Sequence, residues 1–548
     1  MTRDARDVDV LVVGAGPTGL MMACQLARHG VRFRIVDAQV DRAHESRAFA
    51  IQARSMEIFD DLGLAEAFLA RVRRGDPVHF AAHGHERTQI RFDDVLDGET
   101  PFPGLYLLEQ PRTEQLLLDH LAARGITVER PVELRGFAQD GSGVVAELVR
   151  GDRVDSVRCR YLVGCDGAHS RVRDVLGIPF AGATYEQEFV LADCTVDWPF
   201  PHDHLRGFLG RDGVLIHVPL EGGASRVMGA TLGGPARNGA PPTLEEVAAL
   251  ARAVTGAPVE LSAPRWLSRF HFHHRVVARY REGRAFLAGD ACHIHTPVGG
   301  QGMNTGMQDA TNLAWKLALV LAGAAPVSLL DTYHAERHRV GEVLVHTTDR
   351  AFGAITNPGP IMSLLRDLVV PVALPWVGRS RRLRARLVRF VSQLAIRYHA
   401  SDFVAELADG ADGAFRAGPP AGCRAPRVSL GGVSLADLQR QRPIAVLLFG
   451  DAGAGSGPGP SLAELERRHA AFAVFHRVPA TDATELAFQR FGVQSSAVYV
   501  VRPDGYIGFR AYGPSLAPAA DYLQRLLGAS PAARPATAGA FGRPARGA

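Results

Sequence analysis

The sequence predicts an α/β fold, and three of its segments carry this prediction. Residues 8–13 are almost all apolar, as in a strand buried on both faces, and a helical pattern follows from Thr18 to His29. A second strand is predicted at residues 31–36, where it completes a strand–helix–strand unit. Much later, apolar residues 285–288 lead through a glycine-rich loop into a helix predicted at 303–323. Together these segments indicate a Rossmann-like domain.

The turn after the first strand reads Gly14-Ala-Gly-Pro-Thr-Gly19, a GxGxxG pattern. Gly14 allows the sharp reversal, Gly16 lets a pyrophosphate approach the backbone, and Gly19 brings helix and strand together. The phosphate then meets free N–H groups at the helix N-terminus. Asp37 follows the second strand, where it can accept hydrogen bonds from a ribose. A glycine-rich turn without a ligand is the alternative, but strand, helix and acid are all present. The predicted nucleotide-binding residues of this segment are Gly14, Gly16, Pro17, Thr18, Gly19 and Asp37.

A second segment is needed to choose between NAD and FAD. Asp290 follows a strand, and Gly299, Gly300 and Gly302 precede a helix, which suits a polyol chain and a flat ring beside the helix N-terminus. The helix dipole would favour an anionic flavin ring there. Arg47 is a candidate pyrophosphate partner because a guanidinium matches phosphate geometry, although a solvated loop arginine is the alternative. The two segments together predict a flavoprotein.

Composition narrows the function classes. A net charge of +4 over 548 residues argues against a nucleic-acid partner. The six cysteines form no CxxC pair and no metal-like spacing, which is typical of a reducing cytoplasm. The N-terminus passes from charged residues directly into a strand without a signal-like apolar region, and no apolar run reaches membrane length. We expect a cytoplasmic protein without a membrane segment.

The predicted domain organisation is discontinuous. Residues 180–275 have many short strands and turns and are expected to form a β-sheet substrate layer, inserted between the two cofactor-binding segments. Gly418–Gly422 is a predicted linker. The full assignment is a FAD-binding domain at 1–179 and 276–350, with 71–105 contributing to the substrate layer at 180–275, a helical connection at 351–417, a small α/β domain at 426–528 and a disordered tail at 530–548.

The chain resembles the class A flavoprotein aromatic monooxygenases, which have the para-hydroxybenzoate hydroxylase fold. The likeness covers about residues 8–340. Gly14–Gly19 resembles the family's FAD turn, Cys165-Asp-Gly-Ala-His-Ser-Arg171 its "DG" motif, and Ala288-Gly-Asp-Ala-Cys-His293 its "GD" motif. A cysteine at 292 replaces the family's usual alanine, which we interpret as a packing variation.

The resemblance implies roles for further residues. Asp290 would bind the FAD ribityl chain, Asp166 and Gly167 would organise FAD and transient pyridine nucleotide, and Gln110 would contact FAD. The loop facing the isoalloxazine is represented by Pro297, Gly299, Gly300, Gly302, Met303 and Asn304.

The resemblance also implies the reaction. NADPH or NADH would reduce FAD, the reduced flavin would react with O₂ to give a C4a-hydroperoxide, and one oxygen atom would pass to a phenolic or polycyclic aromatic substrate. No second GxGxxG follows a strand, so the pyridine nucleotide would visit transiently. Baeyer–Villiger oxidation, epoxidation and antibiotic modification stay open as alternatives, as does a flavin-containing binding protein. A homo-oligomer is possible.

The sequence does not single out a catalytic base. Candidates in the substrate layer are His217, His271, His273, Tyr185 and Tyr280, although histidine on a strand is more often structural. The histidines at 271, 273, 274, 293 and 295 also invite a metal hypothesis, but no further ligand is evident and flavin activates oxygen without metal. We predict no metal site.

The segment 426–528 resembles the thioredoxin-like domain appended to phenol and polyketide hydroxylases. A strand is predicted at 443–449, a helix from Ser461, and a hairpin at 496–510 whose turn is Pro503-Asp-Gly505. No cysteine follows Cys423, which excludes dithiol chemistry in this domain. We expect a structural role, with deletion affecting solubility or assembly more than flavin reduction.

Overall fold

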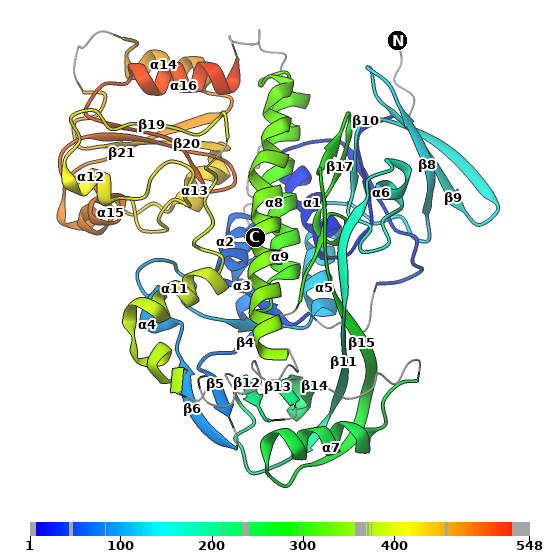
Figure 1. Ribbon diagram of the computed structural model, residues 1–548. Helices are drawn as coiled ribbons and strands as arrows, with labels where there is room; N and C mark the ends of the chain where they lie inside the picture. The colour runs from blue at the N-terminus through cyan, green and yellow to red at the C-terminus, as the bar shows by residue number, and fades with distance from the viewer. Residues whose placement is uncertain are drawn as a thin grey trace, which may run out of the picture.

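The computed structural model shows three main sheets arranged around two long central helices (Figure 1). It describes residues 7–42, 48–82, 84–211, 213–232, 240–296, 299–356, 369, 372–373, 375–399, 401–454 and 459–528. Among these residues, no helix is long and apolar enough to cross a membrane. The predicted tail at 530–548 lies outside them, as do Arg47 and Pro297.

The first sheet has parallel strands at its centre, in the order β16-β17-β10-β1-β2, with β9 and β8 added antiparallel beside β10. Its apolar central strands bury both faces, so the predicted strand–helix–strand unit is present. The strands are β1 (Val8–Val13), β2 (Phe33–Val36), β8 (Glu133–Gln139), β9 (Val144–Arg150), β10 (Arg153–Gly164), β16 (Arg281–Glu282) and β17 (Ala285–Leu287).

The second sheet has the order β18-β15-β11-β14-β13-β12-β5-β6. Short strands were expected here, but two of them have 18 residues each. Register shifts in their pairing interrupt the alternation of apolar and polar residues, which hides their length in the sequence. The strands are β5 (Val78–Ala82), β6 (His85–Ile90), β11 (Phe180–Asp197), β12 (Arg206–Leu209), β13 (Gly213–Pro219), β14 (Ser225–Thr231), β15 (Glu260–Val277) and β18 (His293–Ile294).

The third sheet belongs to the C-terminal part of the chain and has the order β19-β23-β22-β20-β21. The predicted strand, helix and hairpin are all present. The predicted helical connection at 351–417 is wrong in one respect, because β19 pairs in parallel with β23 in this sheet. The strands are β19 (Ala405–Leu407), β20 (Ile444–Phe449), β21 (Ala473–Val478), β22 (Ala497–Val501) and β23 (Ile507–Tyr512), and a small separate sheet contains β3 (Ala50–Ile51), β4 (Arg73–Arg74) and β7 (Tyr106–Leu107).

The helices cover these sheets and connect them (Figure 1). They are α1 (Pro17–Arg28), α2 (Ala53–Asp61), α3 (Ala65–Leu69), α4 (Asp93–Leu96), α5 (Gln110–Ala122), α6 (Arg171–Val175), α7 (Leu244–Thr255), α8 (Gly302–Leu321), α9 (Asp331–Thr356), α11 (Arg381–Val391), α12 (Gly413–Ala417), α13 (Leu435–Gln441), α14 (Leu462–His469), α15 (Glu485–Phe491) and α16 (Ala517–Leu527). The long pair α8 and α9 stands between the first and third sheets (Figure 1).

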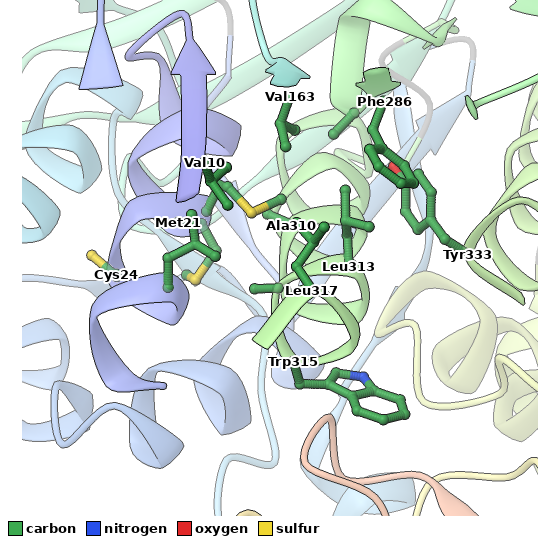
Figure 2. Packing of buried hydrophobic residues seen from close by; sticks show 14 of the residues in the cluster. Val10, Met21, Cys24, Val163, Phe286, Ala310, Leu313, Trp315, Leu317 and Tyr333 are labelled. Atoms are coloured by element: carbon green, nitrogen blue, oxygen red, sulfur yellow. The ribbon is translucent and has the colours of Figure 1, made fainter. Parts of the chain in front are cut away.

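Helix α8 is the centre of the largest apolar core. Its residues Ala310, Leu313 and Leu317 lie in one cluster with Val10 of β1 and Met21 of α1 (Figure 2). Nearly all of α8 is buried, so its position is fixed by packing on several sides. The helix therefore holds its N-terminal turn, which carries the predicted flavin loop, rigidly against the first sheet.

Candidate active site

The turn between β1 and α1 needs its first and third glycines for packing. A Cβ on Gly14, whose φ is +97°, would lie 2.4 Å from the carbonyl oxygen of Cys165. A Cβ on Gly19 would lie 1.9 Å from the carbonyl oxygen of Gly14. Gly16 differs, because no atom of the described residues lies within 4 Å of its would-be Cβ. Beside it, the first turn of α1 has no side-chain cap and no acidic residue. The structure thus combines open space at Gly16 with unpaired helix N–H groups, an arrangement that accepts a pyrophosphate.

The carboxylate of Asp37 supports this turn directly. It accepts a hydrogen bond from the Ala15 backbone at 2.6 Å and pairs with Arg130 at 3.0 Å. The Arg130 guanidinium also donates to the carbonyl of Ala15, at 3.2 Å. Sequence reasoning missed Arg130, which lies 93 residues after Asp37 in a segment without a motif. Asp37, at the end of β2, therefore stabilises the conformation of the nucleotide turn.

The DG segment lies against the same turn. The Cys165 backbone donates to the carbonyl of Val13 at 2.7 Å. Asp166 accepts from the Ser170 hydroxyl at 2.6 Å and from the Val172 backbone at 3.1 Å, so it holds the start of α6. Burial raises the pKa of this carboxyl. Gly167 has a φ of +78° and open space beyond it.

The GD segment joins the two cofactor-binding regions. A Cβ on Gly289 would lie 2.4 Å from the Thr18 hydroxyl, and a Cβ on Gly306 of α8 would lie 2.3 Å from the same atom. These close approaches fit the end of β17 and the helix α8 against α1. Asp290 is exposed at this junction, yet the protein around it desolvates its carboxyl and raises its pKa. An accessible but poorly solvated acid is what a concave binding site presents.

Asn304 fixes the predicted flavin loop. Its side-chain oxygen accepts from the Gln52 backbone at 2.9 Å and from the Ser55 hydroxyl at 2.7 Å. Its side-chain nitrogen donates to the carbonyls of Ala50 and Gly300, at 2.8 and 2.9 Å. The side chain is fully buried and engaged on both sides. It therefore holds the loop in shape through α2, and Met303 beside it packs on the main core.

Four buried polar atoms around this loop have no hydrogen-bond partner in the described structure: Gln52 Oε1, His295 Nε2, Thr296 Oγ1 and Gln301 Nε2. A Cβ on Gly299 would lie 3.1 Å from Gln301 Nε2, so this donor is at the loop itself. Desolvation lowers the pKa of His295 to about 4, which keeps its imidazole neutral. Buried polar groups are normally paired, so these atoms mark the place of a missing polar partner. The polar edge of an isoalloxazine, with its ring nitrogens and carbonyls, fits this set.

Gln110 opens helix α5, where its side chain donates to Glu114 at 2.8 Å. It lies next to the loop region through its backbone, which donates to the carbonyl of Ala48 at 3.1 Å. Arg47 and Pro297 cannot be placed, because they fall outside the described residues.

The second sheet presents an aromatic face toward α9. Phe189, Phe270 and Phe272 pack with Phe352 of α9 in one buried cluster, joined by half-buried Tyr185, Val214, Ile216 and Trp266. Alternate residues of the same strands, such as Val190 and Ala192, point the other way and pack on α7. The cofactor loop follows β18, the strand paired with β15 at this edge of the sheet.

The five candidate bases do not gather at one point. His217 is fully buried, bonds to Ser225 at 2.9 Å, and has a pKa lowered by desolvation to about 4. Tyr280 is also fully buried, and its hydroxyl has no partner in the described structure. Tyr185 lies at a register shift of β11, where it donates to Asp349 and contacts the ring of His274 at 4.8 Å. His271 and His273 bond to the same bulge.

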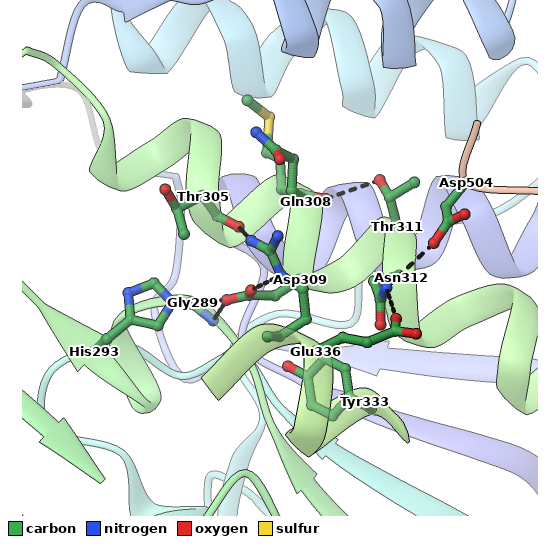
Figure 3. Close-up of polar contacts among 12 residues, drawn as sticks. Gly289, His293, Thr305, Gln308, Asp309, Thr311, Asn312, Tyr333, Glu336 and Asp504 are labelled. Atoms are coloured by element: carbon green, nitrogen blue, oxygen red, sulfur yellow. Dashed lines mark hydrogen bonds and ion pairs between the residues drawn. The ribbon is translucent and has the colours of Figure 1, made fainter. Parts of the chain in front are cut away.

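Cys292, His293 and Asp309 come close enough to suggest a metal site among the described residues. Their contacts explain the grouping in another way. Asp309 accepts from His293 at 2.8 Å and from Arg337 at 2.7 Å, and burial holds the pKa of the Cys292 thiol well above its usual value. The Asp309 carboxylate is thus already paired with the Arg337 guanidinium. It also accepts a hydrogen bond from the Gly289 backbone at 3.1 Å (Figure 3).

This site is that of a nucleotide-dependent flavoenzyme, and comparisons with known proteins identify its family. Residues 7–348 match the family model described as FAD binding domain, and the chain belongs to this family. It is 35% identical, over its whole length and 98% of the relative's, to 6-methylpretetramide 4-monooxygenase of Streptomyces rimosus. The protein is a FAD-dependent aromatic monooxygenase that uses O₂, with NAD(P)H as the co-substrate typical of this class.

Solved structures agree. OxyS anhydrotetracycline hydroxylase from Streptomyces rimosus is 30% identical, with a TM-score of 0.75 over 96% of this chain and 100% of that one. Aklavinone-11 hydroxylase, solved in a ternary complex with FAD and aklavinone, is 27% identical, with a TM-score of 0.76 over the same shares.

Proposed function

We propose that this enzyme hydroxylates a polycyclic aromatic polyketide held between the aromatic face of the second sheet and the cofactor loop. The observation that carries the proposal is this face, in which half-buried Tyr185 and Trp266 pack on a buried layer of four phenylalanines from β11, β15 and α9. Strand β15 also pairs with β18, the edge strand that leads into the loop. Flat aromatic ligands are favoured by such surfaces, because ring–ring contacts add to apolar burial. Relatives named for 6-methylpretetramide, anhydrotetracycline and aklavinone support a polycyclic aromatic substrate here.

The proposal assigns roles around FAD. Gly14, Gly16 and the start of α1 would receive the pyrophosphate, and Asp290 the ribityl chain. Gly299 and Gly300 would face the ring, with Gln52, His295, Thr296 and Gln301 satisfying its polar edge. Bound FAD supplies the oxygen-transfer chemistry, and these residues would hold and shield it.

Tyr185, Asp349 and His274 are the groups best placed to handle a substrate proton on the aromatic face. The Tyr185 hydroxyl donates to Asp349, which is partly open to solvent, and His274 Nδ1 lies 3.7 Å from the same carboxylate. A hydroxylated ring on this face could therefore pass a proton toward water through this group.

The C-terminal sheet supports the thioredoxin-like assignment, since β20 and β21 are parallel, β22 is antiparallel to β20, and β23 is antiparallel to β22. The role of this C-terminal sheet would be structural.

We also propose a cytoplasmic location, because all six cysteines are free thiols. The proposal includes a homo-oligomer.

The test is a substrate panel with the FAD-loaded enzyme. We would measure NAD(P)H oxidation, O₂ uptake and product mass with a tetracycline precursor, an anthracyclinone and a simple phenol. The proposal predicts coupled oxidation and a product heavier by one oxygen atom with a polycyclic compound only. Efficient turnover of the simple phenol, with none of the polycyclic compounds accepted, would refute it. Chromatography then separates hydroxylation from lactone formation.

A further inference from the structure

We infer that the turn between β22 and β23, residues Arg502–Gly505, is a positioning element of the cofactor site. It belongs to the C-terminal sheet, yet its polar groups are buried among α2, α8 and α9. The inference rests on FAD binding, which the family shows, and not on the identity of the substrate.

The first contact is an ion pair with α9. The Arg502 guanidinium donates to both carboxylate oxygens of Glu336, at 2.6 and 2.8 Å. Glu336 also accepts from Lys316 of α8 at 2.8 Å. It accepts from Asn312 of the same helix at 2.7 Å (Figure 3). All these residues are at most 2% exposed. One carboxylate of α9 therefore joins the cofactor helix to the C-terminal sheet.

The second contact is with α2, which holds the flavin loop. The Asp504 carbonyl accepts a hydrogen bond from Arg54, and the Asp504 carboxylate accepts from Asn312 at 3.2 Å. Ser55, the next residue after Arg54, is one of the two groups that hold the oxygen of Asn304. Two hydrogen bonds, made by the neighbouring residues Arg54 and Ser55, thus connect the turn at Asp504 with the loop at Asn304.

Neighbouring residues strengthen this attachment to α2. Arg424 donates to Glu57 at 2.9 Å, and Arg427 makes a bidentate pair with Asp61 at 2.6 and 2.7 Å. Both pairs are buried. The C-terminal part therefore supplies three arginines to acids on α2 and α9. Because these acids are buried, water does not replace the arginines as their hydrogen-bond donors.

The third contact reaches the GD segment. Arg337, adjacent to Glu336, donates to Asp309 at 2.7 Å, and Asp309 in turn holds the Gly289 backbone (Figure 3). The same arginine donates to the Tyr398 hydroxyl at 3.3 Å, and the Tyr398 ring lies 4.3 Å from that of Tyr506, which follows the turn. Both ends of the cofactor site are thus connected to one turn.

An unpaired buried charge is costly. Arg502 pairs with Glu336 and with Asp504, and Lys316 is the other cation on Glu336. Removing Arg502 therefore leaves two buried carboxylates with one cation, so the surrounding elements shift to solvate the excess charge. Here the elements that would shift are α2 and α8, whose first turns define the flavin loop. A displaced loop binds FAD less well, so the effect of the turn should appear in cofactor affinity.

The test uses the full-length chain and FAD alone. Arg502→Met removes the charge at similar length, Arg502→Lys keeps a charge, and Arg467→Met, at an exposed position on α14, is the matched control. FAD affinity is measured by flavin fluorescence titration of the apoprotein, and Tm is measured with and without FAD. We expect Arg502→Met to weaken FAD binding at least about fivefold, the lower range of coupling between linked sites. The lysine variant should recover part of the loss, and the control should match the wild type.

A lower Tm with unchanged FAD affinity in Arg502→Met would show a merely structural role and overturn the inference. If this variant fails to fold, Asp504→Asn is the substitute, because it keeps the carbonyl bonded to Arg54 and removes only the carboxylate charge. Weaker FAD binding by Asp504→Asn supports the inference, and wild-type affinity refutes it. Neither measurement involves a substrate, so failure here leaves the proposed reaction untouched.

Discussion

At the scale of single residues, the three glycines of the nucleotide turn separate packing from binding. Gly14 and Gly19 lie against backbone atoms, whereas Gly16 faces open space. The GxGxxG pattern predicts all three glycines. The structure shows that the fold requires Gly14 and Gly19, because a side chain at either would clash with the backbone.

Gly14→Ala and Gly16→Ala should behave differently. The first places a Cβ against the Cys165 carbonyl at positive φ, and we expect a loss of about 1–3 kcal/mol in unfolding free energy. The second should leave the apoprotein as stable as the wild type but weaken FAD binding, because the new methyl group would occupy the space in which we propose that the pyrophosphate binds. Denaturant unfolding of the apoprotein and FAD titration measure the two effects. Equal FAD affinity in Gly16→Ala would rule out a pyrophosphate at this point.

Asp290→Ala should yield folded protein with little bound FAD. Loss of a charge-assisted hydrogen bond to the ribityl chain corresponds to about tenfold or more in affinity. The purified protein's flavin-to-protein absorbance ratio reports the outcome, with Asp174→Ala, an exposed acid on α6, as a control. Full flavin retention would remove Asp290 from the site.

His217 should make stability fall in acid. Its folded-state pKa is lowered to about 4, so below about pH 6.5 the unfolded chain takes up a proton that the folded protein does not. Stability is therefore unaffected at neutral pH and is lost as the pH falls from about 6.5 toward 4. Relative to His217→Gln, the wild type should lose about 1.4 kcal/mol more between about pH 7.5 and 5.5. Urea unfolding at the two pH values checks this, and parallel losses in both proteins would contradict it.

At the scale of elements, the sequence predicts those helices and strands whose own residues show a periodic apolar pattern or a turn motif. Apolar periodicity, glycine positions and turn residues predict helices at 18–29 and 303–323 and a hairpin near Pro503, and the structure has helices at 17–28 and 302–321 and the hairpin of β22 and β23. Strand β19 was missed because three residues paired with a distant strand have no local pattern. Arg130, Arg337 and Arg502 were missed for the same reason, since their partners lie far away in sequence or on another element.

The element that holds the flavin loop is the first turn of α2 together with Asn304 of α8. Asn304→Ala removes four hydrogen bonds and leaves buried backbone groups of Ala50 and Gln52 without that partner. We expect about 1–3 kcal/mol lower stability and weaker FAD binding. Asn304→Asp keeps both acceptor contacts but turns its second oxygen toward the carbonyls of Ala50 and Gly300 in a buried site, so it should lose at least as much stability as the alanine variant. Thermal unfolding with and without FAD compares them, and wild-type stability in the aspartate variant would be inconsistent with this account.

At the scale of the whole molecule, the C-terminal part is not an independent appendage. The sequence suggested that its deletion would change solubility or assembly more than flavin reduction. The buried pairs Arg427–Asp61 and Arg502–Glu336 predict instead that the remaining chain loses cofactor binding as well. A chain ending before Ala405 should be recovered without FAD or as aggregate. A soluble truncated protein with normal flavin content would show that the C-terminal part is dispensable.

The bond between Arg54 and Asp504 spans 450 residues of sequence. At a translation rate of about 5–20 residues per second, the second helix of the nascent chain leaves the ribosome roughly 20–90 s before its last partner is made. During that interval water solvates the charged groups of Arg54, Glu57 and Asp61. The flavin loop then lacks the contacts that hold it in its final conformation. FAD uptake should therefore follow release of the finished chain, and synthesis in cells should depend on chaperones that protect this early half while it waits.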